Sequence, residues 1–455
     1  MLVKHTPSTF EKLHVLGGMA TDDILARPQP RNARQPYAVQ TRNDAPGVYR
    51  AALPNGKFIN LMRVMFTDYC MMDCHFCPNS HWVPRKRYAF KVDELANAFM
   101  EMHRRQTVAG LFLSSGIAGS AFKTTERLIQ VVEIIRKKHG FKGYIHMKVM
   151  PGTEYQYVEA AHRLGTRLSI NIETPTVDHM RKLSKMKELE RDILKPMSWI
   201  ADLIRDNSEA SRHSGPAGLS QGGRDSGATP AAIGQATQFV VGASDESDWD
   251  IYERMDQLYS EWNFKRVYYS PFQPVRHTPL EEHPVTPMIR EHRLYQVDWL
   301  RRVYKFTNDE MKLAFDERGF LSSEDDPKTV IAVENLDSFP VDVNAATRDM
   351  LLRVPGVGPV SADRILKNRR THAVDNWRDL QAMGVVRKRA WPFLYFPGHR
   401  PPRAKQLRLD LFSEGAAQRI PDSPPLQGSI DACASTGSCA GCPMFGAPGH
   451  PGPSG

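Results

Sequence analysis

Short apolar segments alternate with helical patterns from residue 58 to residue 270, and no other feature of the chain restricts its fold as strongly. Apolar runs typical of strands occur at 58–66, 109–113, 143–149, 167–172, 237–242 and 266–270. Amphipathic helical patterns lie between them, for example at 92–107 and 125–139. Strands that alternate with helices predict a parallel α/β sheet, closed partly or fully into a TIM-like (β/α) barrel. Functional side chains of such barrels gather where the strands end.

Three cysteines follow the first predicted strand with the spacing Cys-x3-Cys-x2-Cys, at Cys70, Cys74 and Cys77. Three thiolates can hold three corners of a [4Fe–4S] cube and leave one iron open to a small molecule, whereas electron-transfer clusters usually have four cysteine ligands. The next cysteine in the chain is Cys433. A zinc site is the alternative, because zinc also uses closely spaced cysteines, but it normally needs a fourth ligand. His75 lies inside the loop, where it is poorly placed to be that ligand.

This cysteine motif resembles the signature of the radical S-adenosylmethionine (SAM) superfamily. The resemblance implies that the cysteines hold a [4Fe–4S] cluster, that its open iron chelates SAM, and that one electron from it releases a 5′-deoxyadenosyl radical. The electron would come from a reductant such as flavodoxin or ferredoxin. By the same resemblance, Phe76 lies against the adenine of SAM, and the segment 238–242 also contacts the adenine.

Two further groups of residues are candidates for binding SAM. The first follows the second predicted strand, at the place of the superfamily's glycine-rich motif: Ser114, Ser115 and Gly116. The second alternates with apolar residues, and period-two alternation predicts one shared strand face for its members: Ser169, Asn171 and Glu173. An inward polar face would suit the ribose and methionine parts of SAM, and the alternative is that these side chains face solvent. No hydrogen-donating residue can be identified, so the catalytic residues are unknown.

The positive charge of the chain is concentrated near its C-terminal end. The net charge is +9, and the segment 341–410 alone contains 14 Lys and Arg residues against six Asp, a net +8. Such a segment is typical of a polyanion-binding surface, where the release of counterions favours binding. A solvated basic face without a partner is the alternative.

A helix–hairpin–helix pattern lies inside this basic segment, at 354–366. Its Pro-Gly-Val-Gly-Pro turn lets backbone N–H groups approach a DNA phosphate without a Cβ in the way. Contacts of this kind follow the DNA backbone and imply little sequence specificity. A second, degenerate copy is predicted at 377–389. The candidate DNA-binding residues are Gly356, Val357, Gly358, Arg364, Lys367, Arg369 and Arg370.

The order of the two parts, a radical SAM domain followed by a hairpin module, resembles the putative DNA modification and repair radical SAM proteins of bacteria. The resemblance implies an enzyme that uses a 5′-deoxyadenosyl radical on DNA, in repair or in modification. An RNA-modifying enzyme is one alternative. A non-catalytic iron–sulfur sensor bound to DNA is another.

The expected organisation is an N-terminal extension at 1–45, a radical SAM domain at 46–330, a small all-α hairpin module at 331–400 and a flexible, disordered tail at 401–455. Within the radical SAM domain, the segment 207–236 is rich in Ser, Gly and Ala. It has few apolar side chains to bury, so it is expected to be a disordered insertion.

The tail contains two short motifs. One resembles the peptide by which bacterial DNA-processing proteins dock on the replication sliding clamp, with anchors at Gln406, Leu409, Leu411 and Phe412. A β-edge of the folded module is the alternative reading of that peptide. The other motif could hold a second iron–sulfur cluster or a zinc ion, or could remain as free thiols: Cys433, Cys439 and Cys442.

Cysteine usage and hydropathy indicate the compartment. All six cysteines fall into two triplets, which argues against a disulfide framework and for a reducing cytoplasm. No run of 18 apolar residues is present, so no membrane span is expected. The N-terminal residues lack the apolar region of a secretory signal.

Overall fold

The computed structural model describes residues 7–20, 47–52, 58–213 and 231–401, and the chain divides into two compact units. Unit 1 consists of Met1–Leu53 and Phe58–Glu291, and unit 2 consists of Pro54–Lys57 and His292–Gly455. The sequence placed the boundary near residue 330, about 40 residues later. The earlier division has a physical reason, because the segment after residue 292 is bonded to the hairpin module. Arg353, for example, forms two bonds of 2.7 Å with the carboxylate of Glu310.

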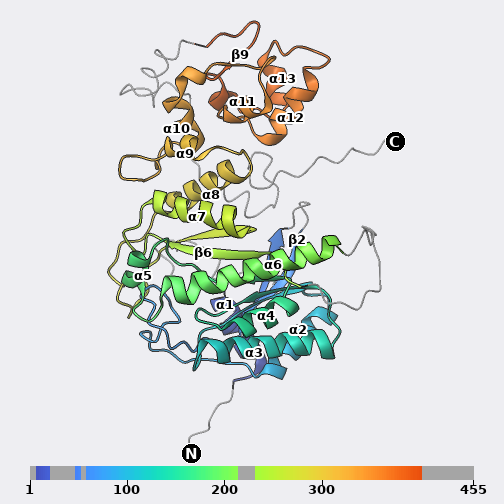
Figure 1. The fold of residues 1–455 in the computed structure, drawn as a ribbon, viewed down its shortest axis with the longest axis vertical. Helices are drawn as coiled ribbons and strands as arrows, with labels where there is room; N and C mark the ends of the chain where they lie inside the picture. Colours follow the sequence, from blue (N-terminus) through green and yellow to red (C-terminus); the bar gives the residue numbers. More distant parts are fainter. Residues whose placement is uncertain (1–6, 21–46, 53–57, 214–230, 402–455) are drawn as a thin grey trace, which may run out of the picture. The chain divides into compact units, whose positions relative to one another are not determined.

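A seven-stranded sheet is the core of unit 1 (Figure 1). The strands neighbour one another in sequence order, β1 pairs antiparallel with β2, and all the other pairs are parallel. The sheet is curled into a half-barrel, so the predicted fold class is confirmed. The strands are β1 (Val48–Ala52), β2 (Phe58–Met65), β3 (Gly110–Ser114), β4 (Tyr144–Lys148), β5 (Arg167–Ser169), β6 (Gln235–Val241) and β7 (Arg266–Pro271).

Helices connect the parallel strands, and α2, α3, α4 and α6 lie side by side along one side of the sheet (Figure 1). Several begin at a hydroxyl that accepts a backbone N–H, as Ser120 does for α3 and Ser247 for α7. The helices of unit 1 are α1 (Thr9–Met19), α2 (Val92–Arg104), α3 (Ala121–Glu133), α4 (Tyr155–Leu164), α5 (Val177–Leu183), α6 (Lys195–His213) and α7 (Asp248–Trp262), with π-helical turns η1 (Ile134–Lys138) and η2 (Leu189–Leu194).

The two faces of the sheet differ in chemistry. One face is apolar and fully buried, as expected where helices pack on a sheet; its members include Met62, Val64, Leu111, Leu113, Ile145, Met147, Leu168, Phe239, Val241 and Val267. The opposite face carries Arg63, His146 and Ser169, which are directed away from that apolar core by the period of two.

Two sequence expectations differ from the structure, and a third segment, the N-terminal extension, contains a helix. The strand predicted at 167–172 ends at Ser169, and beyond it the Thr237 hydroxyl accepts the Ile172 N–H and donates to the Ile170 carbonyl in place of backbone pairing with β6. The insertion expected at 207–236 is shorter, since α6 continues to His213 and β6 begins at Gln235. The N-terminal extension contains α1, in which Leu16 is buried and Lys12 forms an ion pair of 2.7 Å with Glu94.

Unit 2 is mainly helical and begins within α8 (Met288–Arg302), which crosses the boundary between the units. It also contains a short parallel pair of strands, β8 (Val341–Asp342) and β9 (Leu394–Tyr395), so the module is not entirely α. Its helices are α9 (Asn308–Lys312), α10 (Pro327–Glu334), α11 (Arg348–Arg353), α12 (Pro359–Asn368), α13 (Trp377–Ala382) and α14 (Arg387–Ala390), with a 3-10 turn η3 (Leu336–Ser338).

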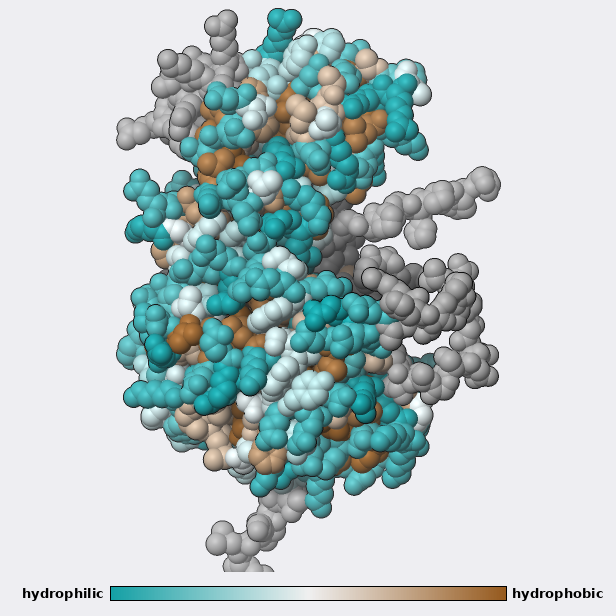
Figure 2. Space-filling view, viewed as in Figure 1, coloured by the Kyte–Doolittle hydropathy of each residue, from teal (hydrophilic) through white to brown (hydrophobic). Residues whose placement is uncertain are grey.

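On the face drawn in Figure 2, hydrophobic residues form small separate patches among hydrophilic ones. Within the part of the chain that the structure describes, no helix is both long enough and apolar enough to cross a membrane.

Candidate functional site

The three cysteines of the predicted cluster motif lie on the loop that follows β2, at the carboxyl edge of the sheet. The Cys74 side chain is 5% exposed, and the other two cysteines are half-buried. The pKa of Cys74 is raised to about 11, mainly by burial; Lys187 lowers it, and Glu173 and Cys70 contribute to the rise. Burial also raises the pKa of Cys77 well above its usual range, and Cys74 and Cys70 add to the rise. The three thiols therefore lie close enough to raise one another's pKa, and their thiolate forms would need a positive partner such as a bound metal.

The turn predicted to contact SAM packs directly against this cysteine loop. The Gly116 N–H donates to the carbonyl of Thr67 at 2.7 Å, and the Met71 N–H donates to the carbonyl of Ile117 at 2.9 Å. A Cβ on Gly116 would lie only 2.3 Å from the carbonyl oxygen of Tyr69. Glycine is required here by close backbone approach, and the approach brings Ser114–Gly116 beside the thiols.

A second anchor ties the cysteine loop to the end of α5. Asp73 accepts bonds from the Ser184 hydroxyl and from the Lys185 N–H, the latter at 2.8 Å. Burial opposes ionisation of Asp73, but these hydrogen bonds prevail and lower its pKa. The ionised carboxylate of Asp73 therefore holds the cysteine loop against the end of α5.

His75 is engaged by the same end of α5. Its N–H donates to the carbonyl of Leu183 at 2.9 Å, and its ring Nδ1 lies 2.8 Å from the carbonyl oxygen of Lys182. Among the residues that the structure describes, no three His, Cys, Asp or Glu side chains converge on the position of a single metal ion. The His75 ring is thus engaged by the end of α5. In a [4Fe–4S] cube each cysteine sulfur would bind a different iron.

Lys187 was not singled out by the sequence, yet it lies at the centre of the site. Its Nζ is 3.4 Å from the carboxylate of Glu173, and both side chains are buried. Burial lowers the pKa of Lys187, but the charges of Cys74 and Glu173 outweigh this and raise it. Asn171 donates to the other oxygen of Glu173 at 3.4 Å. Lys187 lies on an irregular segment with no periodic pattern, so no sequence signal marked it.

The third residue of the predicted polar group, Ser169, has a different partner. Its hydroxyl lies 2.9 Å from the Nε2 of His146 on the neighbouring strand β4. Asn171 and Glu173 follow the end of β5, so the three residues do not form one regular strand face. Asn171 and Glu173 are therefore hydrogen-bonded to each other beyond the strand, whereas Ser169 is part of the sheet and contacts His146.

The two segments predicted to contact adenine meet in an apolar cluster. Leu183, Ala243 and Phe272 form the buried part of this cluster, and Phe76 and Val240 pack against it. Phe76 comes from the cysteine loop, whereas Val240 and Ala243 come from the end of β6 and the loop after it. This apolar cluster, against which the neighbour of Cys77 packs, offers a surface suited to an adenine ring.

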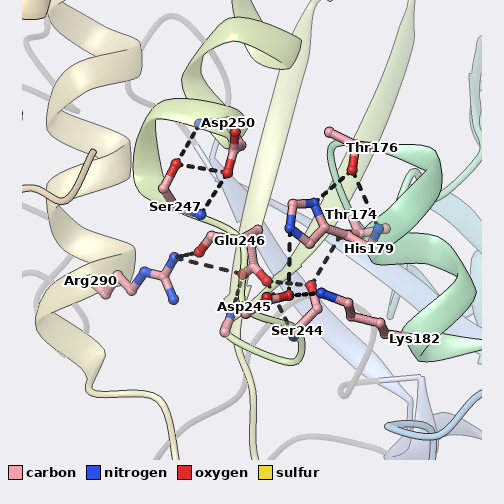
Figure 3. Close-up of polar contacts among 11 residues, drawn as sticks. Thr174, Thr176, His179, Lys182, Ser244, Asp245, Glu246, Ser247, Asp250 and Arg290 are labelled. Atoms are coloured by element: carbon pink, nitrogen blue, oxygen red, sulfur yellow. Dashed lines mark hydrogen bonds and ion pairs between the residues drawn. The ribbon is translucent and has the colours of Figure 1, made fainter. Parts of the chain in front are cut away.

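Polar contacts fix the loop after β6 against α5 (Figure 3). Lys182 forms an ion pair with Asp245, and the His179 Nε2 lies 3.7 Å from the same carboxylate. Glu246 is buried and accepts bonds from the Gly242 and Ser244 N–H groups. Burial raises the pKa of Glu246, whereas Ser244 and the Arg290 guanidinium, 3.7 Å away, lower it. The wall that Phe76 packs against is therefore held by neighbouring charged groups.

In unit 2 the predicted hairpin joins α11 to α12, and the second copy joins α13 to α14. Gly356 has a φ of +81°, and its carbonyl accepts the Val386 N–H at 3.0 Å. Gly384, in the second hairpin, has a φ of +93°, and a Cβ there would lie 3.0 Å from the Ser361 hydroxyl. Each turn uses a left-handed glycine and packs against the other hairpin.

The predicted DNA-binding cations have unequal environments. Arg364, Lys367 and Arg370 are exposed on α12 and just after it. Arg369 is half-buried and donates to the carbonyls of Val343 and Ala346, at 3.0 and 2.6 Å. Arg369 therefore also stabilises the module itself.

Lys328 stabilises the first hairpin turn through a hydrogen bond, and the sequence did not predict a role for it. Its Nζ donates to the carbonyl of Val357 at 2.6 Å and lies 4.6 Å from the centre of the Tyr304 ring. The side chain of Val357 is 1% exposed, and its N–H donates to the carbonyl of Val354 at 3.1 Å, so Val357 is held within the module. Gly358 caps α12.

The predicted clamp-binding peptide and the second cysteine triplet lie outside the described residues. The clamp anchors are Gln406, Leu409, Leu411 and Phe412, and the cysteines are Cys433, Cys439 and Cys442.

Comparison with known proteins identifies both parts. Residues 64–211 match the radical SAM superfamily, and residues 341–368 match the helix–hairpin–helix motif. No curated protein matches the chain.

Solved structures similar to this chain include methylornithine synthase (15% identity, covering 52% of this chain and 60% of that one, TM-score 0.38). The FeFe-hydrogenase maturase HydG from Carboxydothermus hydrogenoformans has 14% identity, covering 53% and 51%, with a TM-score of 0.37. Coproporphyrinogen III oxidase from Escherichia coli has 11% identity, covering 59% and 56%, with a TM-score of 0.31. The chain spans 49% and 60% of the length of the first two solved structures that it matches.

Proposed function

Because residues 64–211 form a radical SAM superfamily domain, we propose that the chain is a radical SAM enzyme that acts on DNA, in repair or in modification. One observation carries the catalytic part of the proposal. Three buried or half-buried thiols lie close together on the loop after β2, and the turn at Gly116 packs so closely against that loop that a Cβ there would lie 2.3 Å from a carbonyl oxygen.

Cys70, Cys74 and Cys77 are the residues that would hold a [4Fe–4S] cluster, and the donor set fits, since three soft thiolates leave one iron open. When bound, such a cluster supplies the electron that cleaves SAM. The chain's own residues then have distinct tasks. Phe76 and Val240 provide an apolar wall for adenine. Lys187 offsets the negative charge of the thiolates and of Glu173, so that the buried site is not left with unpaired anions.

Ser114, Ser115 and Gly116 are proposed to contact SAM through the backbone of their turn, because the turn lies beside the thiols. Asn171 and Glu173 are proposed to bind its polar groups. Ser169 is the last residue of β5, just before Asn171 and Glu173, and its hydroxyl is already engaged by His146. We therefore include it among the SAM-binding residues only because of this position. The reductant in this scheme is an external protein such as flavodoxin or ferredoxin.

The hairpin module supports DNA as the substrate class. Its two hairpins present backbone turns beside exposed cations, an arrangement suited to successive phosphates. Arg364, Lys367 and Arg370 are the side chains proposed to contact them, with Gly356, Val357 and Gly358 contributing backbone.

Formation of 5′-deoxyadenosine tests the proposal. The full-length protein is reconstituted anaerobically, given dithionite and SAM, and assayed alone, with DNA and with RNA. We expect 5′-deoxyadenosine that DNA stimulates and Cys74→Ala abolishes. Met71→Ala is the matched control, because Met71 is exposed on the same loop and is not a candidate ligand.

The other outcomes contradict the proposal in different ways. A fully loaded cluster that never cleaves SAM would leave the DNA-bound iron–sulfur sensor. Stimulation by RNA and not by DNA would support the RNA-modifying alternative.

A further inference from the structure

Four aromatic side chains of unit 2 pack together around the ring of His399. The centre of that ring lies 5.0 Å from the ring centre of Trp377, 5.1 Å from that of Phe396 and 5.6 Å from that of Trp391. The rings of Trp377 and Phe396 also contact each other, with their centres 5.4 Å apart. We name these four residues, Trp377, Trp391, Phe396 and His399, the aromatic cluster.

Backbone hydrogen bonds hold the aromatic cluster in place. The Phe396 N–H donates to the His399 carbonyl at 3.2 Å, and the His399 N–H donates to the Phe396 carbonyl at 2.9 Å. Gly398 has a φ of +89° and allows the tight turn between them. The His399 Nε2 lies 3.1 Å from the carbonyl oxygen of Trp391. The rings are therefore ordered before a partner binds, which lowers the entropic cost of binding.

The aromatic cluster is open to solvent mainly at one ring. Phe396 is 1% exposed, Trp377 and His399 are half-buried, and Trp391 is 39% exposed. Single exposed apolar side chains are common on protein surfaces and need no explanation. Trp391 differs from such a side chain because three further aromatic groups support its ring. Exposed and well-supported tryptophans are the side chains that most often anchor a binding partner.

Cations lie beside the aromatic cluster. The guanidinium of Arg387 lies 5.6 Å from the centre of the Trp377 ring. Arg378 directly follows Trp377 in the chain and Arg400 directly follows His399, and all three arginines are exposed. Guanidinium groups suit phosphate oxygens because they donate paired, charge-assisted hydrogen bonds.

The acidic residues of this part of unit 2 leave those arginines available. The segment 371–400 contains five Lys and Arg residues against two Asp. Both aspartates, Asp375 and Asp379, accept bonds from the side-chain amide of Asn376, at 2.7 and 2.9 Å. Arg389 of the same segment is paired with Asp326 at 2.5 Å, so it is not counted among the available cations. The charge around the aromatic cluster is complementary to a polyanion.

The aromatic cluster also adjoins the first hairpin turn. The Val386 N–H donates to the carbonyl of Gly356 at 3.0 Å, and the backbone nitrogen of Ala390 lies 3.3 Å from the position that a Cβ on Gly356 would take. Trp391 follows Ala390 directly. The exposed ring is thus one residue away from the backbone that packs on this turn. A DNA strand bound at the turn by a phosphate would have its neighbouring nucleotides close to Trp391.

We propose that the aromatic cluster binds an unpaired base of DNA, which stacks on the Trp391 ring while Arg378, Arg387 and Arg400 contact the flanking phosphates. Inside a duplex each base face is covered by the next base pair, so a protein ring stacks only on a base that is unpaired or has left the stack. Every base has such a face, so the site has little sequence preference. The inference rests on the proposed function and adds the form of DNA that is bound.

Binding of two DNA probes to the reconstituted full-length protein tests this. One probe is a fully paired duplex, and the other is the same duplex with one additional, unpaired 2-aminopurine. This adenine analogue loses fluorescence when it stacks. We expect the second probe to bind about tenfold more tightly than the first, a difference typical of one stacked base, and its fluorescence to fall on binding.

Three variants make the result specific. Trp391→Leu keeps an apolar side chain but removes the ring, so it should bind the two probes within about twofold of each other and should not quench 2-aminopurine. Trp391→Phe keeps an aromatic face and should retain most of the preference. Met350→Ala is the matched control and should retain all of it, because Met350 is 46% exposed on α11 in the same unit and is not part of the aromatic cluster. Thermal unfolding midpoints establish that each variant is folded.

Equal affinity of the unmodified protein for the two probes would overturn the proposal, and so would a preference that Trp391→Leu leaves unchanged. A preference for an unpaired base that appears in RNA probes and not in DNA probes would make RNA the occupant. No binding to either DNA probe would overturn both this inference and the DNA part of the proposed function, whereas binding without preference would overturn this inference alone. None of these readouts requires SAM cleavage, so a failure here is distinct from a failure to form 5′-deoxyadenosine.

Discussion

Gly116 shows how one residue determines whether the cysteine loop can take its observed path. Its N–H is bonded to Thr67, and the space that a Cβ would need is occupied by the backbone of Tyr69 and by the Cβ of Cys70, 3.2 Å away. Backbone atoms cannot move aside as the end of a side chain can. Any larger residue at this position must therefore displace the loop that carries the thiols.

We predict that Gly116→Ala lowers iron content and abolishes 5′-deoxyadenosine formation in a folded protein. The added methyl would overpack the turn, at a cost of about 1–3 kcal/mol. Iron per protein after reconstitution and the circular dichroism spectrum are the measurements. Gly18→Ala is the control, since a Cβ on Gly18 has nothing within 4 Å. Normal iron loading of Gly116→Ala would refute the close-approach argument.

Glu291 on α8 provides a prediction about pH. It is buried, and burial raises its pKa from 4.5 to about 7. The folded protein therefore binds this proton more tightly than the unfolded chain does. Its contribution to stability is present below pH 4.5, falls as pH rises, and is lost above about pH 7.

Glu291→Gln removes the ionisable group and should raise stability at pH 8, on the order of 3 kcal/mol from the size of the pKa shift. At pH 4.5 the stability of Glu291→Gln should differ little from that of the unmodified protein. Thermal unfolding midpoints of the iron-free protein at the two pH values test this. Glu282→Gln, at an exposed position, should show no such difference between the two pH values. An equal gain for Glu291→Gln at both values would contradict the assignment.

At the scale of elements, two neighbouring arginines at the end of α12 have different roles: one stabilises the module and the other is available to DNA. Arg369 and Arg370 are neighbours of the same type, but Arg369 donates to two carbonyls of the segment before α11, whereas Arg370 is exposed. Helix geometry turns adjacent residues about 100° apart, so one side chain packs inward and the next faces solvent.

Arg369→Ala should therefore destabilise the module by about 1–3 kcal/mol, because two buried carbonyl acceptors lose their donor. Arg370→Ala should leave the unfolding midpoint unchanged, weaken DNA binding and reduce the salt dependence of log K by about one. Denaturation and DNA titration at several salt concentrations distinguish the two. Equal losses of stability and of DNA affinity in Arg369→Ala and Arg370→Ala would contradict the separate roles of the two residues.

At the scale of the whole molecule, the two kinds of chemistry belong to separate units. Cys70, Cys74 and Cys77 lie in unit 1, whereas both hairpins lie in unit 2. Each unit has its own apolar core, with Leu111 and Phe239 buried in the first and Leu351 and Phe393 in the second.

We predict that removal of iron by a chelator abolishes SAM cleavage but leaves the affinity for DNA and its salt dependence within about twofold, since hairpin contacts of this kind need backbone and cations only. Fluorescence anisotropy of labelled duplex DNA with iron-loaded and iron-free protein provides the measurement. A large loss of affinity in the iron-free protein would mean that the cluster region is itself a principal DNA contact.

The sequence by itself determined what depends on local pattern. Alternating strands and helices specified the α/β sheet, and the glycines around Val357 specified a hairpin; the spacing of Cys70, Cys74 and Cys77 predicts a thiolate site. Each of these follows from periodicity or from backbone freedom, which are properties of a few neighbouring residues.

Only the tertiary structure decided which distant residues meet. Lys187 reaches Glu173 and Cys74 because the chain returns from α5 to the carboxyl edge of the sheet. Arg63 and Arg167 share a face because three intervening strand pairs are in register. Neither relation leaves a periodic trace in the sequence, since register and curl are set by packing of the whole sheet.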